Sequence, residues 1–263
     1  MKLAISNIAW TAEQDSQVYE LMQANGFNGL EIAPTRIFPE KPYDKLEEAR
    51  NWAENVKKKY NLCIPSMQSI WFGRTENIFG TEEEFSTLVD YTRRAIDFAA
   101  VIGCENLVFG CPRNRIIQKE TDLAVGIKFF RIIGNYAASK GVIIGMEANP
   151  PIYSTNYIND TESALDLIRQ VESDGFKLNL DIGTMIYNQE RAKILAGKVE
   201  MINHVHVSEP RLKPVEKRRL HQEIVDILVD EGYQRFVSVE MGYVEDRTVL
   251  ENVMTYVKGV FDW

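Results

Sequence analysis

The sequence predicts an α/β protein built as a single (β/α)8 TIM barrel. Short apolar segments of strand character alternate with longer segments of helix character along the whole chain. Eight such alternations fit into 263 residues, close to the roughly 250 residues typical of this barrel. No linker rich in proline or serine and no shift in composition divides the chain, so we expect one domain over residues 1–263.

The predicted strands share a short apolar run bounded by glycine, proline or polar residues. They span residues 3–6, 29–33, 62–69, 106–110, 142–147, 177–181, 202–207 and 236–240. Alternation with helices favours a parallel sheet, and eight units favour a closed barrel over an open doubly wound sheet. The sequence contains no glycine-rich dinucleotide fingerprint and no Walker-type phosphate loop.

The predicted helices lie between these strands and carry recognisable start and stop residues. They span residues 13–25, 43–60, 81–102 and 121–140, and a further helix begins at residue 161. We expect threonines to cap the last three of these helices, namely Thr81, Thr121 and Thr161. Glycines stop three of the helices, namely Gly26, Gly103 and Gly141.

Composition and charge limit the classes of partner. The chain has 45% hydrophobic and 26% charged residues, which is ordinary for a globular protein, and its formal net charge is −8. Nucleic acids and anionic membranes favour clustered basic residues, so we expect this chain to bind neither. No apolar run approaches the roughly 18 residues of a membrane span.

The ends and the cysteines of the chain predict a cytoplasmic protein. Met1 leads directly into the first strand, which leaves no room for a targeting peptide. The three cysteines, Cys63, Cys104 and Cys111, are odd in number and lack metal-ligand spacing. This usage is typical of reduced thiols in the cytosol.

Four consecutive predicted strands in the second half of the chain each carry a metal-binding side chain at or next to their end. These residues are Glu147, Asp181, His206 and Glu240, and they lie 34, 25 and 34 residues apart. Burying a carboxylate after an apolar run is costly unless a cation or a partner compensates it. In a parallel barrel all strand ends of one kind meet on one face, so we expect these four side chains to share a site.

Each of these four residues taken alone is weak support for a metal site. A lone glutamate at a strand end is more often a surface or capping residue, and only the repetition in four successive units favours a ligand set. His204 lies two residues before His206 on the same strand face, so we expect it to pack one layer deeper in the barrel.

Three carboxylates and one imidazole suit one divalent cation, with Mn²⁺ or Mg²⁺ favoured and Co²⁺ or Zn²⁺ also compatible. Such a cation would polarise a substrate carbonyl and its neighbouring hydroxyl. Glu147 and Glu240 could then flank the substrate carbon, one removing a proton and the other returning it through an enediolate.

Other residues near the predicted strand ends are candidates for binding the substrate. Trp10 and Trp71 could stack on a sugar ring, or they could simply pack at the rim. Gln68 and Asn149 could hydrogen-bond to hydroxyl groups, although Asn149 could equally satisfy the backbone of its proline-rich loop.

The charged residues near the strand ends do not decide whether the substrate is anionic or uncharged. Arg113 and Arg115 follow the fourth strand, and either of them facing inward would select an anionic substrate such as a phosphorylated sugar. A solvated loop is the competing interpretation. Glu31 ends the second strand and could bind a hydroxyl or an arginine such as Arg113.

These segments resemble the xylose isomerase-like barrels, a family of sugar isomerases, ketose 3-epimerases, hydroxypyruvate isomerases and inosose dehydratases. The resemblance covers essentially the whole chain and rests on SNIAW, GLEIAP, SMQSIWFG, VFGCPRNR, GMEANP, NLDIGT, HVHVSEPR and VSVEMG. It implies that the Glu, Asp, His, Glu quartet binds one divalent cation and that its two glutamates are the acid and base. It also implies that Arg211 contacts a substrate oxygen. A homo-oligomer is compatible with the resemblance, because barrels of this group often associate through loops at the active-site face, but the sequence leaves the oligomeric state open.

The sequence departs from the epimerases at one position. The resemblance implies a substrate-binding histidine three residues after the metal aspartate, where this chain has Thr184. We therefore expect a metal-dependent isomerase or epimerase of a small sugar, sugar phosphate or sugar-derived keto acid. The alternatives are a dehydratase of a keto-inositol-like substrate and a barrel that binds a sugar without converting it.

Overall fold

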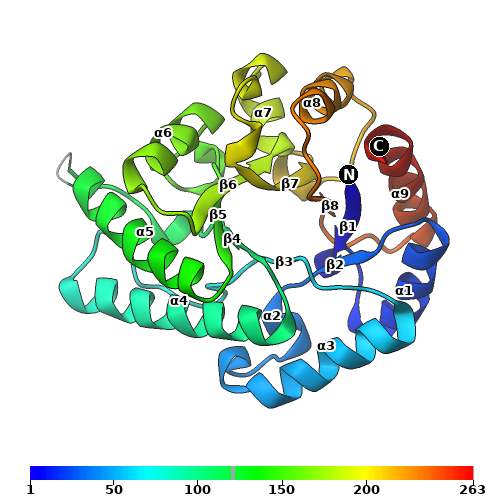
Figure 1. Ribbon diagram of the computed structural model, residues 1–263, viewed down its shortest axis with the longest axis horizontal. Coiled ribbons are helices and arrows are strands. Elements are labelled where there is room, and N and C mark those ends of the chain that lie inside the picture. The colour runs from blue at the N-terminus through cyan, green and yellow to red at the C-terminus, as the bar shows by residue number, and fades with distance from the viewer. Residues whose placement is uncertain (120–121, 263) are drawn as a thin grey trace.

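In the computed structural model, which describes residues 1–119 and 122–262, the strands form one parallel barrel with the helices packed outside it (Figure 1). Within these residues the sheet has eight strands in the order β2-β1-β8-β7-β6-β5-β4-β3. Single bridges between Gly29 and Cys63 and between Ile32 and Met67 join β2 to β3 and close the ring. The predicted fold class is confirmed.

The strands are short and buried on both faces, as expected for a parallel barrel surrounded by helices. They span β1 Lys2–Ser6, β2 Gly29–Glu31, β3 Ser66–Met67, β4 Asn106–Phe109, β5 Ile143–Met146, β6 Phe176–Asp181, β7 Ile202–Ser208 and β8 Phe236–Glu240. Every predicted strand is present. The third is much shorter than predicted, because only Ser66 and Met67 pair with β4 in the regular ladder.

The helices form the outer ring of the molecule, and β1 and β8 pair where the first and last units of the barrel meet (Figure 1). The α-helices span α1 Asp15–Ala24, α2 Pro34–Ile37, α3 Leu46–Tyr60, α4 Glu82–Ile102, α5 Asp122–Ser139, α6 Thr161–Val171, α7 Ile182–Asn188, α8 Arg219–Asp230 and α9 Arg247–Phe261. Their apolar faces pack on the strands, and the polar faces meet solvent.

Of the three predicted helix caps, one is confirmed, one is wrong and one lies outside the described residues. Thr81 caps α4 in a capping box, because its hydroxyl accepts from the Glu84 amide while the Glu84 carboxylate accepts from the Thr81 amide. The prediction for Thr161 was wrong by one position: the Asp160 carboxylate caps α6 and accepts from the Ser163 amide at 2.7 Å. A carboxylate competes well with a hydroxyl for free amides at a helix start. The predicted cap Thr121 lies outside the described residues.

The register of the strands brings the candidate ligands together. Asp181 on β6 lies opposite His206 on β7, and Ser208 on β7 lies opposite Glu240 on β8. Neighbouring strands of a sheet lie about 4.8 Å apart, so side chains at equivalent heights can share one ion. In the described ranges no helix is both long enough and apolar enough to cross a membrane.

Candidate metal centre

The predicted quartet lies together at the C-terminal end of the barrel. Each of Glu147, Asp181, His206 and Glu240 offers one ligand atom, and these atoms all lie within 4.8 Å of one another. Asp181 and Glu240 are the last residues of β6 and β8, His206 lies within β7, and Glu147 directly follows β5. The geometry places one oxygen- and nitrogen-rich group of donors on four successive strands.

His206 occupies the centre of this group and is hydrogen-bonded on both sides of its ring. Its Nδ1 atom lies 3.0 Å from Oε1 of Glu147 and 3.2 Å from Oε2 of Glu240. Its Nε2 atom lies 3.0 Å from Oε2 of Glu31, a completely buried carboxylate. Nδ1 is therefore the nitrogen available to a cation, and a proton on Nε2 would be donated to Glu31.

Glu31 is the residue of the site whose position sequence reasoning missed. It was interpreted as a partner for a substrate hydroxyl or for Arg113, but it points into the barrel against His204 and His206. The signal was present, because Glu31 ends an apolar strand in the same way as the quartet residues do. Its distance of 175 residues from His206 hid the contact.

Glu147 and Asp181 are each oriented by donors from neighbouring strands or loops. Asn149 and Asn179 donate from their side-chain amides to the two oxygens of Glu147, both at 3.0 Å. The Ser208 hydroxyl donates to Asp181 at 2.6 Å, and the Thr184 amide also donates to Asp181. These contacts use only some of the lone pairs of each carboxylate, which leaves further oxygen sites for a cation.

Two buried carboxylates, Glu147 and Glu240, and the partly buried Asp181 need positive charge at this spacing. Burial raises the pKa of Glu240, and the nearby Glu147 and Asp181 carboxylates raise it further. Burial also raises the pKa of Asp181, with Glu147 adding to the effect. Burial alone would lower the pKa of His206, but Glu31 and Glu240 outweigh it and hold that pKa well above its usual value. A hard divalent cation fits this donor set in both charge and ligand type.

His204 lies one layer below, as predicted. Its Nε2 atom is 3.1 Å from Oε2 of Glu31, but the two atoms do not have hydrogen-bond geometry. Burial lowers the pKa of His204, so the ring is held as a neutral group inside the barrel. Together with Glu31 and His206 it forms a second group of close donors, which shares His206 with the quartet.

A cavity of about 180 Å³, which we call the metal-side cavity, lies above the quartet. Its walls come from the ends of β3 to β8 and include Gln68, Asn149, Tyr153, Glu209 and Cys111. Glu209 is paired with Arg218 at 2.6 Å. Burial raises the pKa of Cys111 to about 12, so its thiol is protonated and is no nucleophile at neutral pH.

The predicted substrate-binding residues divide between this cavity and other places. Gln68 and Asn149 line it. Trp71 is turned into the core, where its Nε1 donates to Thr92 at 3.0 Å and its ring packs on Phe109. Trp10 lines a separate cavity nearby, and its Nε1 donates to Asp15 at 2.8 Å.

The three arginines near the site take different positions. Arg113 and Arg211 are exposed and do not line the metal-side cavity in the described structure. The Arg211 amide donates to the hydroxyl of Tyr153, which does line it. Arg115 is completely buried behind the site, and its donors go to Asn149 and to backbone carbonyls.

Thr184 does not replace the histidine of the epimerases. Its side chain is buried and its hydroxyl donates to the carbonyl of Ala148 at 2.8 Å. The residue thereby ties the start of α7 to the loop after β5, directly behind Glu147. It orients the metal side of the site and presents no group to the cavity.

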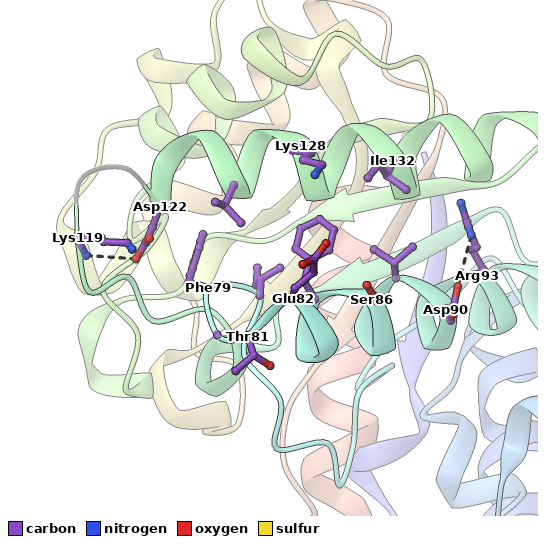
Figure 2. Close-up of a pocket in the computed structure, with 15 residues that line it drawn as sticks. Phe79, Thr81, Glu82, Ser86, Asp90, Arg93, Lys119, Asp122, Lys128 and Ile132 are labelled. Carbon is purple, nitrogen blue, oxygen red and sulfur yellow. Dashed lines mark hydrogen bonds and ion pairs between the residues drawn. The ribbon is translucent and has the colours of Figure 1, made fainter.

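A larger cavity, of about 660 Å³, lies elsewhere, on the outside of the barrel between α4 and α5 (Figure 2). Its walls mix aromatic side chains such as Phe79 and Phe85 with charged residues, of which Asp90 and Arg93 are 3.4 Å apart and paired with each other. None of the quartet lines it. Its size therefore does not make it the centre of the chemistry.

The sequence comparison agrees with the geometry of the barrel and its quartet. Residues 19–258 match the model of the xylose isomerase-like TIM barrel family. The chain belongs to this family. The resemblance predicted from the motifs is thereby confirmed. No curated protein sequence matches the chain.

Three solved structures share the fold over nearly the full chain. A 3-keto-D-glucoside 4-epimerase from E. coli is 18% identical with a TM-score of 0.78, covering 98% of this chain and 99% of the other. A D-psicose 3-epimerase from Clostridium cellulolyticum, solved with D-tagatose, is 16% identical with a TM-score of 0.79 and 99% coverage of each. A probable 3-DHS dehydratase from Bacillus anthracis is 15% identical with a TM-score of 0.73, covering 98% and 99%.

Proposed function

We propose that this chain is a divalent-metal-dependent sugar isomerase or epimerase that moves a proton between a keto sugar and two glutamates. The observation that carries the proposal is the quartet, whose ligand atoms lie within 4.8 Å of one another at the active-site face of the barrel. The family assignment supports a carbohydrate substrate, since two of the solved neighbours are sugar epimerases.

The cation would be held by Glu147, Asp181, His206 and Glu240, and the mostly oxygen donor set favours Mn²⁺ or Mg²⁺. When bound, it supplies a Lewis acid that polarises a carbonyl and an adjacent hydroxyl. Glu31 keeps Nδ1 of His206 turned toward the quartet by accepting a hydrogen bond from the opposite nitrogen.

Glu147 and Glu240 are the proposed proton-transfer groups. They belong to β5 and β8, the outer two of the four strands that carry the quartet, so they approach the cavity from different sides. Asn149 and Asn179 fix the oxygens of Glu147, whereas Glu240 accepts from no side-chain amide among the described residues. One glutamate, ionised, would remove a proton from the carbon next to the carbonyl, and the other, protonated, would donate its own proton to the opposite face.

The metal-side cavity supports a small substrate with several hydroxyl groups. Its volume of about 180 Å³ suits one sugar ring. Gln68 and Tyr153 present polar groups on its wall that could orient hydroxyls of that ring.

Solvent deuterium exchange tests this proposal. With Mn²⁺ supplied, the protein should introduce deuterium next to the carbonyl of at least one ketose, keto-glucoside or keto-inositol. Glu147→Gln and Glu240→Gln should each slow this exchange by about 100-fold or more, since each removes a proton-transfer group. A matched control is Glu251→Gln, which changes an exposed glutamate on α9 and should have no effect.

Three outcomes decide between the candidate functions. Exchange with return of an isomer or epimer supports the proposal. Loss of water to give an unsaturated product would identify a dehydratase instead. The enediolate that the same base forms can expel a β-hydroxyl, which leaves as water after protonation. Binding of a sugar without any exchange would make the chain a non-catalytic sugar-binding barrel and would contradict the proposal.

A further inference from the structure

We propose that the substrate is an uncharged glycoside with two rings, of which the reacting ring fills the metal-side cavity and the second ring lies over Phe72 in an adjoining cavity. This inference rests on the proposed function, because it assigns the substrate class of the same site. It predicts discrimination against phosphorylated sugars and against free ketoses.

The adjoining cavity completes the mouth of the barrel. It has a volume of about 530 Å³, and its walls come from segments that follow β1, β2 and β3, whereas the metal-side cavity is lined by residues from β3 to β8. Ser69 lines both cavities. Ser69, after the end of β3, stands in the wall between the two spaces, so a ligand that reaches across Ser69 would occupy both.

The volumes argue for a substrate larger than one ring. The metal-side cavity, at about 180 Å³, is filled by the ring that reacts. The neighbouring space is about three times larger, at about 530 Å³, and would stay open beside a bound monosaccharide. Burying a second ring there would keep both the ring and the reacting centre away from water.

Phe72 provides the contact that a second sugar ring would use. Its side chain is 69% exposed, unusual for phenylalanine, and it stands on the wall of the adjoining cavity. The apolar face of a pyranose packs on an exposed aromatic ring. Thr11 and Thr35 on the same wall carry hydroxyls that can hydrogen-bond to sugar hydroxyls.

The charges of the two cavities argue for an uncharged substrate. Among the described residues the only cationic side chain that lines either cavity is Arg36, and it is already paired with Asp15 at 2.6 Å. Four carboxylates line the metal-side cavity, namely Glu147, Asp181, Glu209 and Glu240. A phosphate beyond the reach of the cation would meet no free positive charge and several negative ones.

Arg115, which the sequence offered as a selector of anions, cannot take this role. It is completely buried, and its guanidinium donates to the carbonyls of Gly110 and Glu147 and to the side chain of Asn149. Its donors also reach the carbonyls of Tyr157 and Ile158. The positive charge is used to hold loops and does not face the substrate.

The test compares three probes in the deuterium-exchange assay with Mn²⁺: a 3-keto disaccharide, its methyl 3-keto-glucoside counterpart and a ketohexose 6-phosphate. We expect kcat/KM to be at least about tenfold higher for the disaccharide than for the methyl glycoside, and lowest for the phosphate. Phe72→Ala should lower the ratio of kcat/KM for disaccharide over methyl glycoside by about tenfold, through KM. Phe72→Trp should restore the ratio.

Tyr243→Ala is the matched control, since Tyr243 is also an exposed aromatic, at 55%, but lines neither cavity in the described structure. The Tyr243→Ala variant should have the same ratio of kcat/KM for disaccharide over methyl glycoside as the wild type. The inference is overturned if the disaccharide is no better than the methyl glycoside, if the phosphate is preferred, or if Phe72→Ala and Tyr243→Ala behave alike.

Calorimetric binding of the unoxidised parent disaccharide and its methyl glycoside separates this inference from the proposed function. Tighter binding of the disaccharide that Phe72→Ala removes, without exchange on any probe, would support the adjoining subsite and contradict the proton-transfer function. Exchange on the methyl glycoside, without a preference for the disaccharide that depends on Phe72, would support the proton-transfer function and contradict the adjoining subsite.

Discussion

Glu31 shows how one buried side chain can orient a proposed metal ligand, His206, that lies 175 residues later in the chain. It is completely buried and accepts from Nε2 of His206, so it fixes the tautomer that presents Nδ1 to the quartet. We predict that Glu31→Gln weakens Mn²⁺ binding by about 10- to 100-fold. Calorimetric titration of the metal measures this, and an unchanged affinity would show that Glu31 does not position His206.

Gly110 is a second residue with a role at the site, because its backbone lies so close to the Glu147 carboxylate that a side chain would not fit. A Cβ added at this glycine would lie 2.8 Å from Oε2 of Glu147 and 3.5 Å from Oδ1 of Asn149. Gly110→Ala should therefore displace the Glu147 carboxylate and slow deuterium exchange by about 10- to 100-fold. Gly259→Ala on α9 is the control, because nothing lies within 4 Å of its added Cβ. Equal rates for the two variants would contradict the assigned position of Glu147.

At the residue scale, sequence reasoning could identify the quartet and could not identify its supporting contacts. Glu147, Asp181, His206 and Glu240 follow from one rule, since parallel strands end on one face. The direction in which an indole or guanidinium points depends on packing that the sequence does not display. For this reason Trp71 lies in the core and Arg115 holds loops, although both follow strands at the mouth of the barrel.

At the scale of elements, the loop after β5 depends on Arg115. Its guanidinium joins the end of β4, through Gly110, to the loop that carries Asn149 and Ile158. Arg115→Met would leave several buried carbonyl acceptors without donors, so we predict a loss of about 3 kcal/mol in the free energy of unfolding. Denaturant unfolding measures it. A variant as stable as the wild type would show that these contacts do not hold the loop.

The packing of α8 against α9 predicts a pH dependence of stability. Burial lowers the pKa of His221 from 6.5 to about 4, and its Nδ1 lies 2.9 Å from the hydroxyl of Tyr256. As the pH falls from about 6.5 to about 4, the unfolded chain binds a proton that the folded chain does not, so His221 makes the folded state less stable over this window. Above pH 6.5 the effect is absent.

His221→Gln removes this titrating group and retains a possible hydrogen bond to Tyr256. The free energy of unfolding should then depend less steeply on pH between about 4 and 6.5, by about 3 kcal/mol across the window. Parallel denaturant titrations of both proteins at several pH values give the difference. Superimposable slopes would mean that His221 is accessible to protons in the folded state.

The elements themselves were largely predictable, because apolar runs, caps and glycine stops recur in each unit. The exact residues at which helices and strands begin and end were less predictable. Asp160 and Thr161 are neighbouring cap candidates, and only the folded backbone shows that Asp160 accepts from the amide of Ser163. The third predicted strand, residues 62–69, forms a regular ladder only at Ser66 and Met67, and Cys63 makes a single bridge to Gly29.

For the whole molecule, the order of the strands explains why sites far apart in sequence form one face. β1 pairs with β8 and bridges close β2 onto β3, so the loops of all strands surround one opening. The sequence predicted this closed barrel. It could not predict that two neighbouring cavities share Ser69 or that Arg36, which lines one of them, is paired with Asp15, since both depend on how loops from different units pack together.

Equilibrium dialysis with Mn²⁺ tests the central claim most directly. The wild-type chain should bind one Mn²⁺ per chain at the quartet, and Asp181→Asn should lower its affinity strongly while leaving thermal unfolding similar to that of Glu251→Gln. Asp181 is the variant to use because it is a proposed ligand without a proposed part in proton transfer. Failure of the wild type to bind Mn²⁺, or binding that Asp181→Asn leaves unchanged, would contradict the assignment of the quartet as a metal centre.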